Sequence, residues 1–89
     1  MKSISSTLVA YARGREKALR ANGEFDAHKA KAVNQIKIVA GYCARIHPQK
    51  QLVFVSTIEV PILELIPDDH IAYQKLRKEI FELLDRARA

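Results

Sequence analysis

The chain has 89 residues, of which 48% are hydrophobic and 28% are charged. These proportions exclude a disordered or low-complexity chain, and the length suits one core, so we expect residues 1–89 to form a single domain. The sequence lacks the run of about 20 apolar residues that a membrane-spanning helix needs, so we expect no contact with a membrane. Fifteen Lys and Arg against ten Asp and Glu give a net charge of +5, which favours an anionic partner.

The first half of the chain predicts two helices joined by a short link. Ser3 can cap a helix over 4–21, and Asn22-Gly23 can end it because glycine adopts the left-handed conformation without strain. Asp26 can cap a second helix over roughly 27–47, which must end before Pro48. Each helix has an apolar stripe at helical spacing. The stripes contain Ile4, Leu8, Tyr11, Ala12, Ala18 and Leu19, then Ala32, Val33, Ile36, Val39, Ala40, Cys43 and Ile46. A link of a few residues makes the two helices an antiparallel hairpin.

Residues 52–60 predict one strand or extended segment, because five of the nine are β-branched. The competing interpretation is a short helix capped by Ser56 and Glu59, but Pro61 would then fall where a backbone hydrogen bond is wanted. Pro61 suits the first residue of a brief helical turn through Ile66. A lone strand cannot satisfy its own backbone groups, so the strand implies a homodimer that pairs it across a two-fold axis.

A final helix is predicted over 68–87, with Asp68 or Asp69 as its cap. Its apolar side contains Ala72, Tyr73, Leu76, Ile80, Leu83 and Leu84. The predicted fold is therefore mainly α: an antiparallel helical hairpin plus a C-terminal helix, with one short strand or extended segment. The alternative is an α+β dimer with a two-stranded ribbon between the subunits.

The charges are unevenly distributed along the chain. Residues 1–50 hold ten Lys and Arg against three acids, whereas residues 51–89 hold five against seven. In the last helix, acids and bases lie one turn apart, as Lys78 and Glu82 do, and can pair within the helix. In the hairpin, Glu16 is the only acid near the cations of the first helix, and the second helix has no acid after Asp26, which favours contacts to phosphate groups. The predicted nucleic-acid contacts are Arg13, Lys17, Arg20, Lys31, Lys37 and Arg45.

These observations lead us to expect a small basic regulator in the cytoplasm, associated with nucleic acid and acting without catalysis. The alternative is an adaptor or inhibitor that binds an acidic protein. The cytoplasm follows from the single cysteine, Cys43, because secreted domains of this size usually carry several disulfides.

Arg15 lies in the middle of the first apolar stripe, where an unpaired guanidinium would be costly. It must either reach solvent at the edge of the hairpin or meet an acid on a second subunit or partner. Val9, Ile38 and Phe81 lie at or beyond the edges of their apolar stripes. We therefore predict that Arg15, Val9, Ile38 and Phe81 contribute to an interface.

The residue patterns do not indicate a reaction. Cys43 and His47 share one side of the second helix, but a buried cysteine beside a helix-terminal histidine explains them. The acids of Asp68-Asp69-His70 suit a helix start. The sequence lacks zinc-ligand spacing and a glycine-rich phosphate loop, so we expect neither a metal nor a cofactor.

Overall fold

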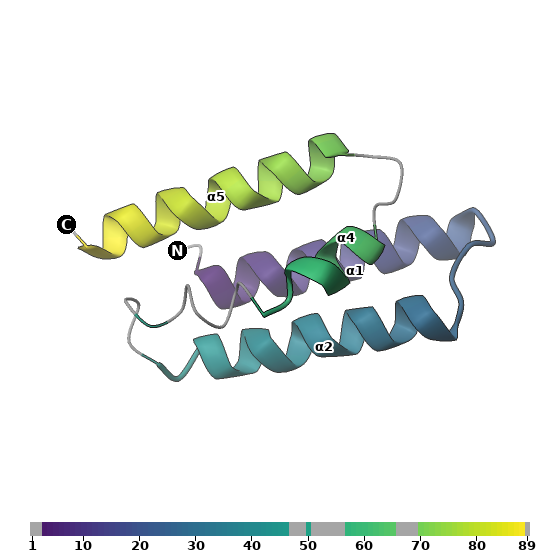
Figure 1. The fold of residues 1–89 in the computed structure, drawn as a ribbon, viewed down its shortest axis with the longest axis horizontal. Coiled ribbons are helices and arrows are strands. Elements are labelled where there is room, and N and C mark those ends of the chain that lie inside the picture. The colour runs from purple at the N-terminus through teal and green to yellow at the C-terminus, as the bar shows by residue number, and fades with distance from the viewer. Residues whose placement is uncertain (1–2, 47–49, 51–56, 66–69, 89) are drawn as a thin grey trace.

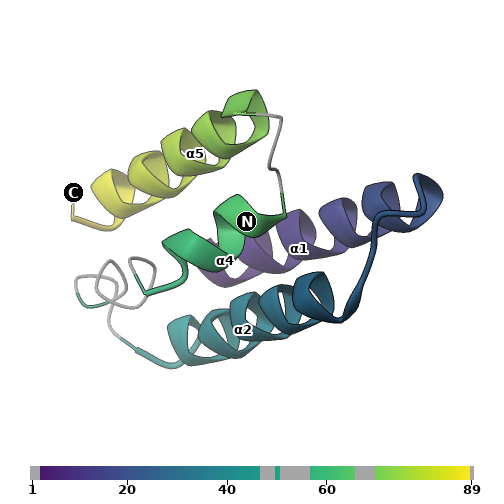
Figure 2. The ribbon, with the colours of Figure 1, turned by 45° about the vertical axis from the view of Figure 1, so that its right-hand side comes forward.

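The computed structural model describes residues 3–46, 50, 57–65 and 70–88. Three long helices lie side by side in one layer, with α1 (Ile4–Ala21) between α2 (Ala27–Cys43) and α5 (His70–Arg88) (Figure 1). The short helix α4 (Glu59–Glu64) covers one face of this layer, over α1 and α2 (Figure 2). The described part of the chain is therefore all helical, and the predicted α1–α2 hairpin is confirmed.

Local signals define both ends of α1 as predicted. Ser3 accepts a hydrogen bond from the backbone of Ser6 at 3.1 Å, and the Ser6 hydroxyl accepts one from the backbone of Ser3, which forms a capping box. At the other end, Gly23 has a φ of 71°. The backbone N–H of Glu24 donates to Leu19 and that of Gly23 to Arg20, the two bonds of a Schellman motif.

Helix α2 begins as predicted and ends earlier than predicted. Asp26 accepts a 2.9 Å hydrogen bond from the backbone N–H of Lys29, and this bond lowers the pKa of the Asp26 carboxyl group. The prediction of helix over Ala44–Ile46 is wrong, because the N–H of Arg45 bonds to the carbonyl three residues back, on Tyr42. That bond tightens the last turn and ends the helix. His47 lies outside the described residues.

The predicted strand over 52–60 is wrong where the structure describes it. Thr57 and Ile58 form a turn and α4 begins at Glu59, while residues 52–56 lie outside the described residues. Pro61 is the third residue of α4, where a helix leaves the backbone N–H unbonded, so proline costs no hydrogen bond there. The first internal bond runs from the N–H of Ile62 to the carbonyl of Ile58. The expectation of a dimer depended on the strand, and the turn and helix found over 57–65 need no pairing strand.

The last helix is confirmed, with bounds at His70 and Arg88 instead of 68 and 87. The predicted caps Asp68 and Asp69 lie outside the described residues. Leu76 and Ile80 are buried as predicted, and Tyr73 and Leu83 pack at the edge of the core. Helix α5 contacts α1, antiparallel to it (Figure 1).

The hydrophobic core lies where α4 meets the α1–α2 hairpin. Leu8, Val33 and Ile36 are among its fully buried side chains, in agreement with the predicted stripes. Ile58 and Leu65, at the two ends of α4, are equally buried, and Ile62 lies between them. Helix α4 thus occupies the groove between the two hairpin helices. Among the described helices, none combines the length and apolar composition needed to cross a bilayer.

Candidate functional site

Two side chains of α1 hold the end of α4 in place. The Tyr11 hydroxyl donates to the carbonyl of Ile62 at 3.1 Å, and Arg15 Nε donates to the carbonyl of Leu65 at 3.0 Å. Carbonyls at the C-terminal end of a helix have no partner within the helix and carry partial negative charge, so a hydroxyl and a guanidinium suit them. The half-buried Arg15 therefore has a partner within its own chain, one that neither prediction for this residue named.

These two bonds orient α1, so that the face opposite Tyr11 and Arg15 is exposed to solvent. Tyr11 and Arg15 face α4, and Arg13 and Arg20 fall on the opposite half of the helical wheel. Lys37 is similarly placed on α2, about opposite Gln35 and Val39, which line a groove against α4. Lys17 flanks Arg13 on the same helix. We call these four exposed residues, Arg13, Lys17, Arg20 and Lys37, the basic face.

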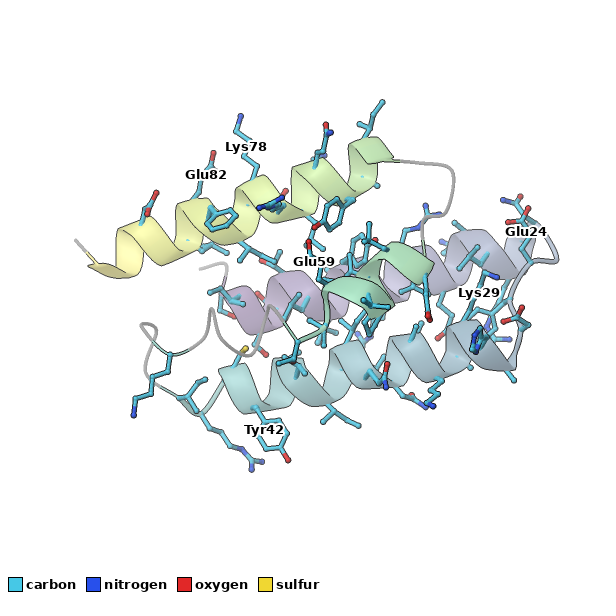
Figure 3. The ribbon with its side chains drawn as sticks, viewed as in Figure 1. Glu24, Lys29, Tyr42, Glu59, Lys78 and Glu82 are labelled. Carbon is cyan, nitrogen blue, oxygen red and sulfur yellow. The ribbon has the colours of Figure 1, made fainter. Side chains whose placement is uncertain are left out.

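The remaining predicted phosphate contacts lie on another side of α2 and in the turn after it. Lys31 is exposed and shares a stripe with Ile38 and Tyr42 along the outer edge of the helix, and the exposed Arg45 lies in the turn that follows α2. Figure 3 shows Tyr42 pointing away from the bundle. The structure therefore divides the six predicted contacts, with four on the basic face and two, Lys31 and Arg45, along the outer edge of α2 and the turn after it.

Two ion pairs join described residues of the hairpin. Arg20 Nε lies 3.2 Å from Glu16, and its guanidinium lies 4.3 Å from the centre of the Phe25 ring. Lys29 Nζ lies 3.5 Å from Asp26. Exposed pairs of this kind contribute little to stability and are easily exchanged for other partners. Among the described residues, Arg13, Lys17 and Lys37 have no acid within 4.0 Å.

The surfaces of α4 and α5 have a different charge. The described residues from 57 onward hold five Lys and Arg and five Asp and Glu, against eight and three in 3–46. The side chains of Lys78 and Glu82 project from α5 (Figure 3), and the predicted pair between them is not among the ion pairs of the described residues. The surplus of positive charge nevertheless belongs to the hairpin.

The predicted interface residues lie in three separate places. Val9 packs against the core from α1, whereas Ile38 is exposed on α2 and Phe81 is exposed on α5, with Arg77 5.6 Å from its ring centre. The structure does not bring them together. Two further exposed hydrophobic residues near Ile38 were not predicted from the sequence. They are Tyr42 on α2 and Val60 on α4. The exposure of Tyr42 could have been predicted because it shares a helical stripe with Ile38. The exposure of Val60 could not, because the sequence predicted a strand there.

The contacts of Cys43 and Glu59 in the fold indicate structural roles for both residues. Burial raises the pKa of the Cys43 thiol, which disfavours the nucleophilic thiolate. Glu59 accepts a 2.5 Å hydrogen bond from Tyr73, which raises the pKa of that phenol. Within the described residues, the acids, histidines and cysteine do not gather in a group that could hold a metal ion.

Comparison with known protein families, with curated proteins and with solved structures finds no match for this chain.

Proposed function

We propose that the protein binds nucleic acid through the basic face and acts as a regulator without catalysing a reaction. The observation that carries this proposal is the exposed, unpaired positive charge of Arg13, Lys17 and Lys37 on the side of the hairpin away from α4. Each phosphate that such a cation neutralises releases condensed counterions, which is the main source of affinity in binding without base readout.

The spacing of the cations on α1 suits a phosphate backbone. From Arg13 to Arg20 the helix rises by about 10 Å. A duplex presents roughly six phosphate charges over that length, more than enough for every cation on the face. Arg20 can exchange its exposed bond to Glu16 for a phosphate at little cost.

The composition of the basic face favours nucleic acid over an acidic protein. Protein interfaces depend on large apolar or aromatic side chains that fill pockets on the partner. Large exposed hydrophobic side chains occur on α2, α4 and α5, and among the described residues α1 has none. A surface of cations without such anchors suits a polyanion.

The proposal predicts binding that depends on charge and on salt. A labelled 20-base-pair DNA duplex, the corresponding single strand and an RNA hairpin serve as probes, with fluorescence anisotropy at two or more salt concentrations. We expect log K to fall linearly with log salt, with a slope of about −0.9 for each duplex phosphate contacted. Absence of binding at low salt contradicts the proposal.

Matched lysine variants test the surface itself. Lys17→Gln with Lys37→Gln removes two exposed charges from the basic face, and Lys75→Gln with Lys78→Gln removes two exposed charges from α5. We expect the first pair to weaken binding at least tenfold and to reduce the salt slope by about 2, and the second pair to change affinity less than twofold. Equal losses of affinity in the two double variants would mean that binding depends on the net charge of the protein and not on the basic face.

A further inference from the structure

The outer edge of α2 and the adjacent surface of α4 form an exposed apolar patch. Ile38 is 58% exposed, Tyr42 is 53% exposed, and Val60, across the junction of the two helices, is 64% exposed. Between the helices runs a groove of about 430 Å³, lined by Gln35, Ile38, Val39, Thr57, Ile58, Val60, Pro61 and Glu64. We call Ile38, Tyr42 and Val60 the apolar patch.

The apolar patch has the arrangement of a protein-binding surface. Single exposed hydrophobic side chains are ordinary, but neighbouring ones beside a groove indicate an interaction site. Ile38 and Val60 line the same groove from opposite helices, and Val39 and Ile58 form part of its wall. A groove between two helices with apolar walls accommodates the apolar side of a third helix, which inserts side chains at positions i, i+4 and i+7.

The charges around the apolar patch indicate what kind of helix would bind there. Lys31 lies two turns before Ile38 on the same stripe, and Arg45 lies in the turn after α2, three residues beyond Tyr42, so the chain carries a cation beyond each end of the apolar patch on α2. The one acid in the groove lining is Glu64. Complementary charge steers association and selects among partners.

A second copy of this chain does not suit the patch. In a symmetric dimer through α2, Lys31 and Arg45 of one copy would lie against the cations of the other. Like charges brought together across an interface oppose association about as strongly as a few apolar contacts favour it. A helix from another protein, with acidic residues flanking its apolar side, is complementary to the groove in shape and to the cations in charge.

We propose that the groove between α2 and α4 binds an amphipathic helix of a partner protein, with apolar side chains against the apolar patch and acidic side chains against Lys31 and Arg45. This inference does not depend on nucleic-acid binding by the basic face. Lys31 and Arg45 also belong to the predicted phosphate contacts, so the decisive variants change apolar residues alone.

A displayed library of 16-residue helical peptides, randomised at every position, tests the proposal with the full-length protein as the target. Binders are selected on the natural chain and counter-selected on Ile38→Ser with Val60→Ser. We expect the surviving peptides to share apolar residues at i, i+4 and i+7 and a net negative charge. Survivors of neutral or positive charge, or an empty selection, would overturn the proposal.

One selected peptide then serves as the probe for affinity. We expect Ile38→Ser with Val60→Ser to weaken its binding at least tenfold, while binding of the DNA duplex stays within twofold. Ile71→Ser, which removes an exposed apolar side chain from α5, is the control and should leave the peptide affinity unchanged. Circular dichroism of each variant reports retention of the helical fold.

Sedimentation velocity without peptide separates this proposal from self-association. A monomer at every concentration is the expected result for the natural chain. A dimer that Ile38→Ser with Val60→Ser dissociates would place a second copy on the patch and refute the binding of a partner helix there. The Lys17 and Lys37 variant should keep its affinity for the selected peptide even where it loses duplex binding, and a loss of peptide binding in it would contradict a site confined to the groove between α2 and α4.

Discussion

Helix α1 of the hairpin and helix α5 have similarly amphipathic sequences, yet the hairpin and α5 are held in different ways. Side chains of the hairpin are buried along its whole length, from Ile4 to Leu19 and from Ala32 to Cys43, with α4 closing the groove. Helix α5 contributes Leu76 and Ile80 to the core and packs against α1. Beside that contact, a groove of about 550 Å³ separates the two helices. A short link makes packing along the whole length easy, because the chain loses little entropy when it brings the two helices together.

Truncation of the core gives the largest expected difference between these regions. Leu8→Ala leaves a closed cavity in the hairpin core and should lower the free energy of unfolding by about 2–5 kcal/mol. Leu76→Ala should cost about 2 kcal/mol, the lower end of that range, since Leu76 lines the groove between α1 and α5 and water can enter the space. Urea denaturation measures both values. Equal losses would show that α5 is packed as tightly as the hairpin.

The bonds from α1 to the end of α4 should have the next largest effect. Arg15→Met keeps the apolar stem and removes the bond to Leu65, at an expected cost of about 1–2 kcal/mol. Tyr11→Phe removes the bond to Ile62 and should cost about 0.5–1.5 kcal/mol. The double variant checks whether the two bonds act on the same element, because coupled contacts lose less than the sum of the single changes. Strictly additive losses contradict a shared role in holding α4.

Alanine substitutions at two glycines, one in the turn and one within α2, should change the stability in opposite directions. Gly23→Ala should destabilise the protein by about 1 kcal/mol, since a side chain is strained at a φ of 71°. Gly41→Ala is the matched control, within α2 and with open space around the added carbon atom. It should stabilise the protein by about 0.5–1 kcal/mol. Thermal unfolding with calorimetry distinguishes the opposite signs, and two losses would contradict the Schellman motif as the end of α1.

The smallest effect concerns the contact between α4 and α5. Hydrogen bonding to Glu59 raises the pKa of Tyr73 above its ordinary value near 10. The stability from this bond is therefore fully present below pH 10 and is lost as the pH rises through the raised pKa. Unfolding of the natural chain and of Tyr73→Phe, compared from neutral to alkaline pH, should show a difference that disappears at high pH. A constant difference would mean that the bond does not contribute.

Prediction from sequence succeeded where the signal was local. Ser3, Gly23 and Asp26 act through hydrogen bonds to residues at most five positions away, so they could be recognised without knowing the fold. The apolar stripes of α1 and α2 identified every buried hydrophobic residue of these two helices. The same helical spacing in Ile58, Ile62 and Leu65 was overlooked, because the β-branched residues before them favour a strand.

The candidate surfaces were harder to predict than the helices. The six cations were known from the sequence, but their division between the basic face and the outer edge of α2 depends on where α4 packs. Arg15 was predicted to reach solvent or to meet an acid of a second subunit or partner, and its partner is a carbonyl at the end of a helix that the sequence did not predict. The exposure of Val60 likewise became visible only once Glu59–Glu64 was known to be a helix.

The sequence by itself determined the three long helices, the turn between the first two, and the surplus of positive charge in the first half of the chain. These properties depend on the helical repeat, on caps and on residue counts, which act over a few positions. Only the tertiary structure decided that α4 is a helix, that Tyr11 and Arg15 hold its end, and which sides of α1 and α2 face solvent. Those outcomes depend on contacts between residues about 50 positions apart, which no local pattern encodes.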